Sequence, residues 1–201
     1  MTTSARPDDN GARVARIGIG FAAVVVAAQV SAHLFDFWAL NLRSALLDSA
    51  SEHGIFVRLG SLAILACAVA TLAHRRSSRL AVPLAVVAAW LFADALLGLH
   101  AHLHGRLVNV PLLAAIAAGY WLLAARFAPA PRRLVHAALA LLVLSAAIHV
   151  LGPPALAALG WGQGAWEYQV KIALKEATEI AGWILLASGL LATRRRHAAY
   201  R

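Results

Sequence analysis

Histidines and carboxylates recur at helical spacing in this chain. Gln29, His33 and Asp36 are separated by four and three residues, and His100 and His104 are four residues apart. Side chains at these spacings share one face of a helix. Imidazole and carboxylate groups together suit zinc, copper or iron. We therefore predict a transition-metal site with ligands from His33, Asp36, His100 and His104. The alternative is that these side chains only form interhelical hydrogen bonds or lie in interfacial water.

A charged stripe lies near the carboxyl end of the chain. Glu167, Lys171, Lys175 and Glu179 recur every four residues, and Glu176 is three residues from Glu179. One interpretation is a structural row of ion pairs on a helix that projects beyond a membrane. The other interpretation is functional, with Glu176 or Glu179 meeting the histidines inside a helical bundle.

The depth of this stripe favours the functional interpretation. The uncharged run 180–192 holds only 13 residues, whereas about 20 are needed to cross the core of a bilayer. Counting back about 20 residues from Arg194 reaches Leu174. Glu176 and Glu179 are therefore expected inside the membrane boundary, where an unpaired charge costs roughly 2.5–3.5 kcal/mol or more. We predict that both are functional carboxylates.

Two further residues complete the candidate site. Asp94 lies about two turns before His100, and we predict it as a third catalytic carboxylate. If the site is catalytic, one of the carboxylates would act as general base toward a metal-activated water. His149 lies four residues after Ser145. It is the candidate ligand of a haem b, the alternative cofactor, with His33 or His100 as the second axial ligand.

The composition identifies the kind of scaffold that must position these side chains. Hydrophobic residues make up 61% of the 201-residue chain and charged residues 13%, about half the charge of a soluble domain. The net charge is +9, but the basic residues lie at the ends of apolar segments, which argues for topology signals and against a nucleic-acid partner. The lone Cys67 excludes an internal disulfide and any site with several cysteines.

The apolar segments predict an all-α, polytopic transmembrane helical bundle of about six helices in the lipid bilayer. A charged turn at 74–79 and prolines at 129 and 131 separate helices, and we expect Gly152-Pro153-Pro154 to stop the fifth. This division predicts three parts: an N-terminal tail over 1–12, a transmembrane domain over 13–193 and a basic C-terminal tail over 194–201. The expected helices span about 14–40, 54–73, 80–103, 108–127, 133–151 and 166–193.

The basic residues also predict the orientation. The two tails and the turns after the second and fourth helices hold 13 Arg and Lys residues, whereas the other side holds five. Positive charge favours the cytoplasm, so both termini are expected there, in a bacterial inner membrane. A signal-peptidase site at 29–32 is the alternative for the first helix, and its cleavage would leave five helices.

Two connecting segments carry more than a simple turn. The stretch 41–51 is compatible with a short interfacial helix, and Ser49-x-x-Glu52 with a capping box that opens the second helix. The stretch 154–164 holds apolar residues among glycines, which favours a position along the outer membrane interface.

The acidic pattern is similar to that of a group of uncharacterised bacterial multi-pass membrane proteins. The last helix of that group carries a Glu-Glu-x-x-Glu-x-x-Gly run, matched here by Glu176, Glu179 and Gly182, with Lys175 in place of the first glutamate. An early Phe-Asp pair and a mid-chain acidic residue followed by histidine also match, at Phe35-Asp36 and at Asp94 with His100. The resemblance supports the choice of sites and implies no reaction.

Three functions fit these patterns. The first is a metalloprotein, or a metalloenzyme acting on a lipid-like substrate that enters sideways from the bilayer. The second is a haem b electron carrier. The third is a non-catalytic role, as a transporter, a proton-coupled carrier or an accessory subunit bound to other membrane proteins, in which Glu176 and Glu179 hold a proton or a cation.

Overall fold

The structure, a computed structural model, describes residues 7–48, 54–97 and 106–198. Within these ranges the chain forms six α-helices and no β-strand, which confirms the all-α prediction. The helices are α1 (Pro7–Leu40), α2 (Ile55–Leu72), α3 (Ala81–Leu97), α4 (Arg106–Ala124), α5 (Pro129–Ala158) and α6 (Trp166–Ala198).

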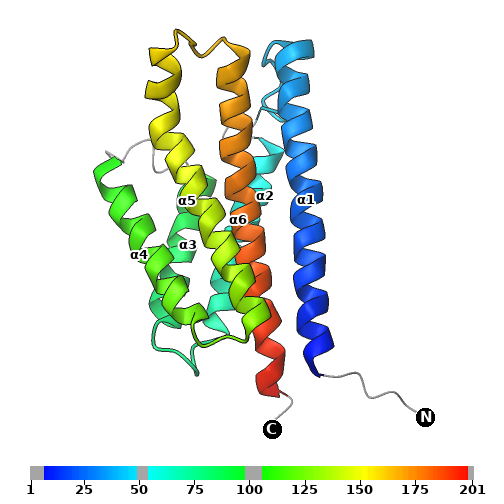
Figure 1. Ribbon diagram of the computed structural model, residues 1–201, viewed down its shortest axis with the longest axis vertical. Coiled ribbons are helices and arrows are strands. Elements are labelled where there is room, and N and C mark those ends of the chain that lie inside the picture. Colours follow the sequence, from blue (N-terminus) through cyan, green and yellow to red (C-terminus); the bar gives the residue numbers. More distant parts are fainter. Residues whose placement is uncertain (1–6, 49–53, 98–105, 199–201) are drawn as a thin grey trace, which may run out of the picture.

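Successive helices alternate in direction, so that both ends of the chain lie at the same end of the bundle (Figure 1). We call this end, with Pro7 and Ala198, the inner end, and the end with Leu40 and Trp166 the outer end. The even number of helices places the two termini together, as the sequence predicts.

The last helix is the centre of the bundle. α6 contacts α5, α1 and α2, and all seven residues from Ala181 to Ala187 are buried. Gly182 and Gly189 allow α5 to approach closely, since an added Cβ would lie 2.7 Å from Leu142 Cγ and 2.8 Å from Val135 Cγ2. Small residues at such contacts are typical of helix packing in membranes.

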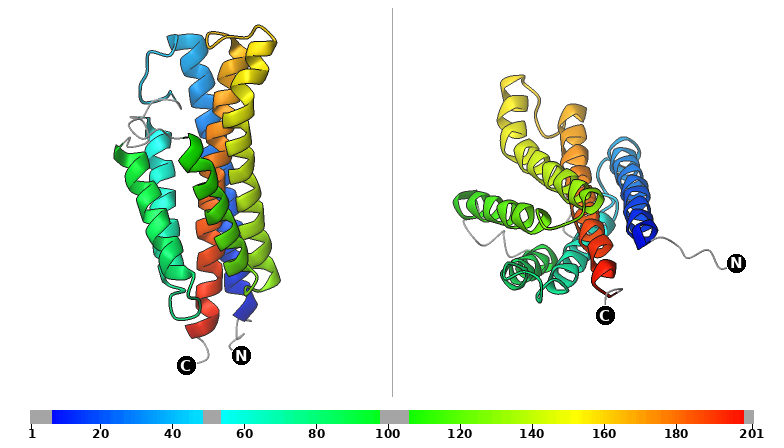
Figure 2. Two further views of the ribbon diagram at one scale, coloured as in Figure 1. Left: turned by 90° about the vertical axis from the view of Figure 1, so that its left-hand side faces the viewer. Right: turned by 60° about the horizontal axis from the view of Figure 1, so that its bottom comes forward.

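Three helices are longer than the other three. α1, α5 and α6 extend past α2, α3 and α4 at the outer end (Figures 1 and 2). By length and composition, 11–40 of α1, all of α2 and all of α5 can each cross a membrane, whereas α3 and the 113–124 part of α4 are shorter apolar helices. These three candidate spans support a membrane protein.

On α1, large apolar side chains lie on the outside and polar side chains lie inside the bundle. Val24 and Trp38 of α1 are 68% and 69% exposed, whereas Gln29, His33 and Asp36 on the same helix are fully buried. Large exposed apolar surfaces are rare on soluble monomers. In hydrocarbon, by contrast, polar groups must face the interior of the bundle.

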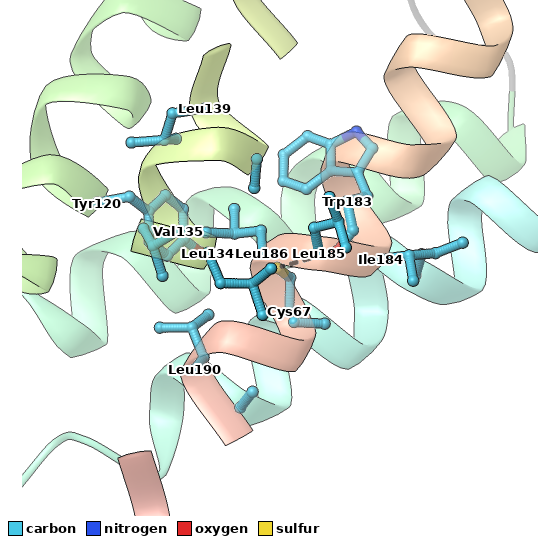
Figure 3. Close-up of a cluster of buried hydrophobic side chains, with 14 of the residues drawn as sticks. Cys67, Tyr120, Leu134, Val135, Leu139, Trp183, Ile184, Leu185, Leu186 and Leu190 are labelled. Atoms are coloured by element: carbon cyan, nitrogen blue, oxygen red, sulfur yellow. Dashed lines mark hydrogen bonds between the residues drawn. The ribbon is translucent and has the colours of Figure 1, made fainter. Parts of the chain in front are cut away.

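Toward the inner end the core is apolar and closely packed (Figure 3). Cys67 of α2, Tyr120 of α4, Val135 of α5 and Leu186 and Leu190 of α6 all have 0% exposure. These five residues define what we call the inner plug. Thr71 and Tyr120 share a hydrogen bond of 3.0 Å, which satisfies the buried phenol hydroxyl.

The prediction that Gly152, Pro153 and Pro154 end the fifth helix is wrong. α5 continues through both prolines to Ala158, and it begins at Pro129 instead of 133. A proline is tolerated in the first turn, where its missing N–H has no helical partner. Pro153 and Pro154 free the carbonyl groups of His149 and Val150, and both residues are exposed, so no buried group loses its partner.

Other helix boundaries also differ from the predicted ones. α1 begins at Pro7 and α6 ends at Ala198, one or two turns beyond the predicted limits. The stretch 41–48 forms turns instead of an interfacial helix, with Asn41 and Leu42 in the left-handed region at φ 53° and 57°. The stretch 154–158 continues α5. The capping box at Ser49 and Glu52 and the predicted end of the third helix lie outside the described residues.

Candidate functional site

Two glutamates of α6 face a cavity in the outer half of the bundle. The cavity has a volume of about 70 Å³ and lies between α1, α2, α3 and α6. Its polar lining comes from Gln29, Ser61, Glu176 and Glu179, and its apolar lining includes Trp183. Since liquid water occupies roughly 30 Å³ per molecule, this space has room for at least two waters.

Lys175 joins the two glutamates into a triad. Its Nζ lies 2.8 Å from Glu176 Oε1 and 2.8 Å from Glu179 Oε2. The Lys175–Glu179 pair has the i, i+4 spacing of helical ion pairs. Ser145 of α5 donates a hydrogen bond to the carbonyl oxygen of Lys175 (3.0 Å), and its hydroxyl is 3.5 Å from Glu179 Oε2. The side chains of Lys175, Glu176 and Glu179 are 21%, 25% and 38% exposed.

The depth of the triad follows from the register of α2 and α6. Cys67 Sγ contacts the carbonyl oxygen of Trp183, and His74 Nε2 contacts that of Leu190, both across 116 residues. The same offset places Glu176 and Glu179 level with residues 60 and 63. At 1.5 Å per residue this is about 8 to 12 Å inside the outer end of α2. An unpaired charge at such a depth is costly, and its pairing offsets that cost.

A row of polar side chains on α1 faces α6 above the cavity. Gln29 donates from Nε2 to the carbonyl oxygen of Ala173 at 3.5 Å. One turn nearer the outer end, His33 Nε2 lies 3.2 Å from Gln169 Oε1, and its Nδ1 lies 3.4 Å from Asp48 Oδ1. Both ring nitrogens of His33 thus contact protein oxygens, so a metal ion would have to displace one of them.

Asp36 completes the row and anchors the segment after α1. Its Oδ1 accepts a hydrogen bond of 3.0 Å from the backbone N–H of Ser44. Its Oδ2 is buried and has no hydrogen-bond partner in the described part of the chain. The two left-handed residues Asn41 and Leu42 reverse the chain, so that 41–48 folds back onto the row. Asp36 and His33 therefore both hold this segment.

The remaining predicted site residues are Asp94, His149, His100 and His104. Asp94 is half-buried on α3, next to Ala95, which lines the cavity. His149 is exposed on α5. His100 and His104 lie outside the described residues. Among the residues that were described, no group of three or more His, Cys, Asp or Glu side chains is placed to hold a metal ion.

Several polar residues of this region have no clear sequence signal. Gln169, Asp48 and Ser61 belong to no motif and no regular spacing of polar residues. In the structure, however, the first two contact His33 and the third lines the cavity. His74 belongs to an arginine-rich turn, but it is 4% exposed and contacts Thr193 Oγ1 at 3.2 Å. Only Ser61 has a weak signal, as a polar residue in an otherwise apolar helical stretch.

Comparison with known proteins gives no family for this fold and site. No protein-family model, curated protein or solved structure matches the chain. The function therefore has to be inferred from the geometry of the triad, the cavity and the polar row.

Proposed function

We propose that this protein is a membrane carrier that binds a proton or a small monovalent cation at the Glu176–Lys175–Glu179 triad. The observation that carries the proposal is the pairing of two carboxylates with one ammonium beside a polar-lined cavity, inside a bundle with an apolar exterior. Ionisable residues within transmembrane bundles are typical of ion and proton pathways.

The charge of the triad supports binding of one positive charge. Two carboxylates and one ammonium sum to −1 when all three groups are ionised. One bound proton or monovalent cation brings this sum to zero, which lowers the cost of keeping the group away from water. The cavity supplies the space, and Ser61 and Gln29 supply polar groups for water or for the cation.

The membrane setting rests on the distribution of arginines and on the apolar exterior. We infer that all six helices cross a bacterial inner membrane, with the inner end in the cytoplasm. α6 contacts α5, α1 and α2, and its Glu176 and Glu179 line the cavity. The resemblance to the bacterial multi-pass group, which rests in part on Asp36, Asp94, Glu176 and Glu179, is compatible with the same proposal.

Flux in proteoliposomes tests this function. The purified protein is reconstituted with an internal pH indicator, a potassium diffusion potential is imposed, and proton uptake is recorded. Uptake of labelled sodium is measured in parallel, so that the two ions are distinguished. We expect flux of one of them, reduced at least tenfold in Glu179→Gln and in Glu176→Gln, since each variant removes a carboxylate charge that the site needs.

Glu167→Gln is the matched control. Glu167 belongs to the same helix and stripe but lies at the outer end, outside the cavity lining. It should retain the flux of the parent. No flux above empty liposomes for either ion, or unchanged flux in Glu179→Gln, would refute the proposal.

A metal site is the second candidate, favoured by the buried Asp36 Oδ2, which has no hydrogen-bond partner among the described residues. We propose zinc, copper or iron at His33 and Asp36 with His100 and His104, and an action on a lipid-like molecule if the site is catalytic. Haem b bound through His149 is the corresponding redox proposal. Elemental analysis of the purified protein tests all of these, and less than about a tenth of an equivalent of metal after reloading would argue against them.

A further inference from the structure

We infer that the cavity exchanges with the outer side alone, along the polar row Gln29–His33–Asp36, and that the segment 41–48 closes this route. This inference deepens the proposed function, because it states how the ion reaches the triad. It depends on three observations: a continuous polar row above the cavity, a segment latched onto that row, and an apolar plug below the cavity.

The row connects the cavity to the outer end. Gln29 lines the cavity, and His33 and Asp36 follow at intervals of four and three residues on the same face of α1. At 1.5 Å per residue, the row extends about 10 Å along the helix axis. All three side chains are fully buried in a helix whose other faces carry exposed apolar residues. A buried polar row of this kind gives water or a cation polar contacts that the apolar surfaces lack.

The latch consists of two contacts with 41–48. Asp36 Oδ1 accepts from the N–H of Ser44, and His33 Nδ1 contacts Asp48 Oδ1 at 3.4 Å. From α6, Gln169 contacts the other nitrogen of His33. The segment is otherwise a series of turns with exposed Leu42 and Leu46. A connection of this kind opens at a lower free-energy cost than a packed helix.

The inner side offers no comparable route among the described residues. Ile64, Ile180 and Trp183 line the cavity, and Cys67 contacts the carbonyl oxygen of Trp183. Below them follow the residues of the inner plug, each with 0% exposure (Figure 3). The buried polar groups on this side bond to one another, Thr71 to Tyr120 and His74 to Thr193. The apolar packing around them is a barrier to ions. The polar row is therefore the route that we assign to the cavity, with 41–48 lying over its outer end.

The single cysteine makes this inference directly testable. Cys67 lies in the inner plug and is the only cysteine of the chain, so the parent protein itself reports access to the plug. In a Cys67→Ala background, Ser61→Cys reports access to the cavity. Two exposed positions identify the sides: Ala45→Cys at the outer end and Ser77→Cys at the inner turn.

Each protein is treated with a membrane-impermeant methanethiosulfonate reagent, in right-side-out and in inverted vesicles. We expect Ser61→Cys to react in the orientation in which Ala45→Cys reacts, and not in the one in which Ser77→Cys reacts. Cys67 of the parent should stay unmodified in both. Reaction of Ser61→Cys from the inner side, or from neither side, would overturn the inference.

Loosening the latch tests the role of 41–48. Adding Asp48→Ala to the Ser61→Cys variant should speed its labelling roughly tenfold, the effect of losing one charge-assisted contact. Adding Asp48→Ala to the Ala45→Cys variant should leave its labelling rate unchanged. If Asp48→Ala does not fold, His33→Gln keeps a polar side chain of similar length and serves instead. Equal labelling rates with and without the loosened latch would refute the closing role.

The labelling result is independent of the flux result. One-sided labelling together with absent proton and sodium flux would keep the access route and remove the proposed function. Flux together with labelling from the inner side would keep the function and remove the route.

Discussion

The strongest test of the triad is a double-mutant cycle between Lys175 and Glu179. Lys175→Met removes the ammonium and keeps most of the apolar stem, whereas Glu179→Gln removes one carboxylate charge at constant size. In the structure both carboxylate oxygens lie 2.8 Å from the same Nζ. Without that nitrogen, two negative charges remain at most twice this distance apart.

The size of the effect follows from burial. Removing one partner of a fully buried ion pair costs about 3–5 kcal/mol. The three side chains here retain 21% to 38% exposure, so we expect a smaller loss, about 1–3 kcal/mol for Lys175→Met. For a chain of this size, each kcal/mol lowers the melting temperature by about 2–4 °C. The single variant should therefore melt about 2 to 12 °C lower than the parent.

The second substitution should recover part of this loss. In Lys175→Met with Glu179→Gln, only the Glu176 charge remains, so the repulsion between carboxylates is removed. We expect a coupling of at least about 0.5 kcal/mol between the two sites, the lower limit for residues in contact. Thermal unfolding of the four detergent-purified proteins measures it. If the stability loss of the double variant equals the sum of the two single losses within about 0.3 kcal/mol, the two residues are not coupled and the triad does not form.

Three further predictions test other parts of the structure, two of them with a matched control variant. His33→Ala should lower stability by about 1–3 kcal/mol, because it removes two buried polar contacts, whereas the exposed His149→Ala should change it by less than about 0.5 kcal/mol; equal losses would contradict the buried row. Gly182→Ala should cost about 1–3 kcal/mol through overlap with α5, and Gly20→Ala, which faces open space, should be neutral or slightly stabilising. Tyr120→Phe should cost about 0.5–1.5 kcal/mol, the contribution of one hydrogen bond, and no loss would argue against the contact at 3.0 Å. Thermal unfolding is the measurement for all three.

The helical architecture could be predicted because it depends on local properties of the chain. Apolar runs and the placement of arginines indicate an even number of helices with both termini at one end, as the structure shows. The spacing of Gln29, His33 and Asp36 places them on one face, and the structure buries that face. The i, i+4 pair of Lys175 and Glu179 is also present.

The partners of these residues could not be predicted in the same way. His33 contacts Gln169 across 136 residues, and it reaches Asp48 only because two left-handed residues reverse the chain. Neither contact leaves a periodic signal. Lys171 Nζ lies 4.5 Å over the ring of Tyr168, a contact that the charge spacing does not suggest. Whether Pro153 and Pro154 end α5 could not be predicted from the sequence either, because the effect of a proline on a helix depends on what surrounds the freed carbonyl groups.

Lys175 also determines which ion the triad can accept. Its ammonium lies between one oxygen of each carboxylate, where a divalent cation bridging the two would lie. It therefore acts as a tethered counter-ion and limits the remaining charge to −1, which one proton or monovalent cation beside it can neutralise. Without it, the two carboxylates carry −2, and a divalent cation would be the better match. Ca²⁺ takes carboxylate oxygens at about 2.3–2.6 Å, close to the 2.8 Å that the ammonium now spans.

We therefore predict that Lys175→Met gains Ca²⁺ binding that the parent lacks. With a dissociation constant of about 0.1–1 mM, at the weak end of protein Ca²⁺ sites, 1 mM free Ca²⁺ should stabilise the variant by about 0.4–1.4 kcal/mol. The parent and Lys175→Met with Glu179→Gln, which retains one carboxylate, should not respond. Melting temperatures with and without Ca²⁺ measure the difference. A variant that ignores Ca²⁺ while melting below the parent would mean that its two carboxylates separate once the ammonium is gone, and that Lys175 holds the geometry of the site as well as its charge.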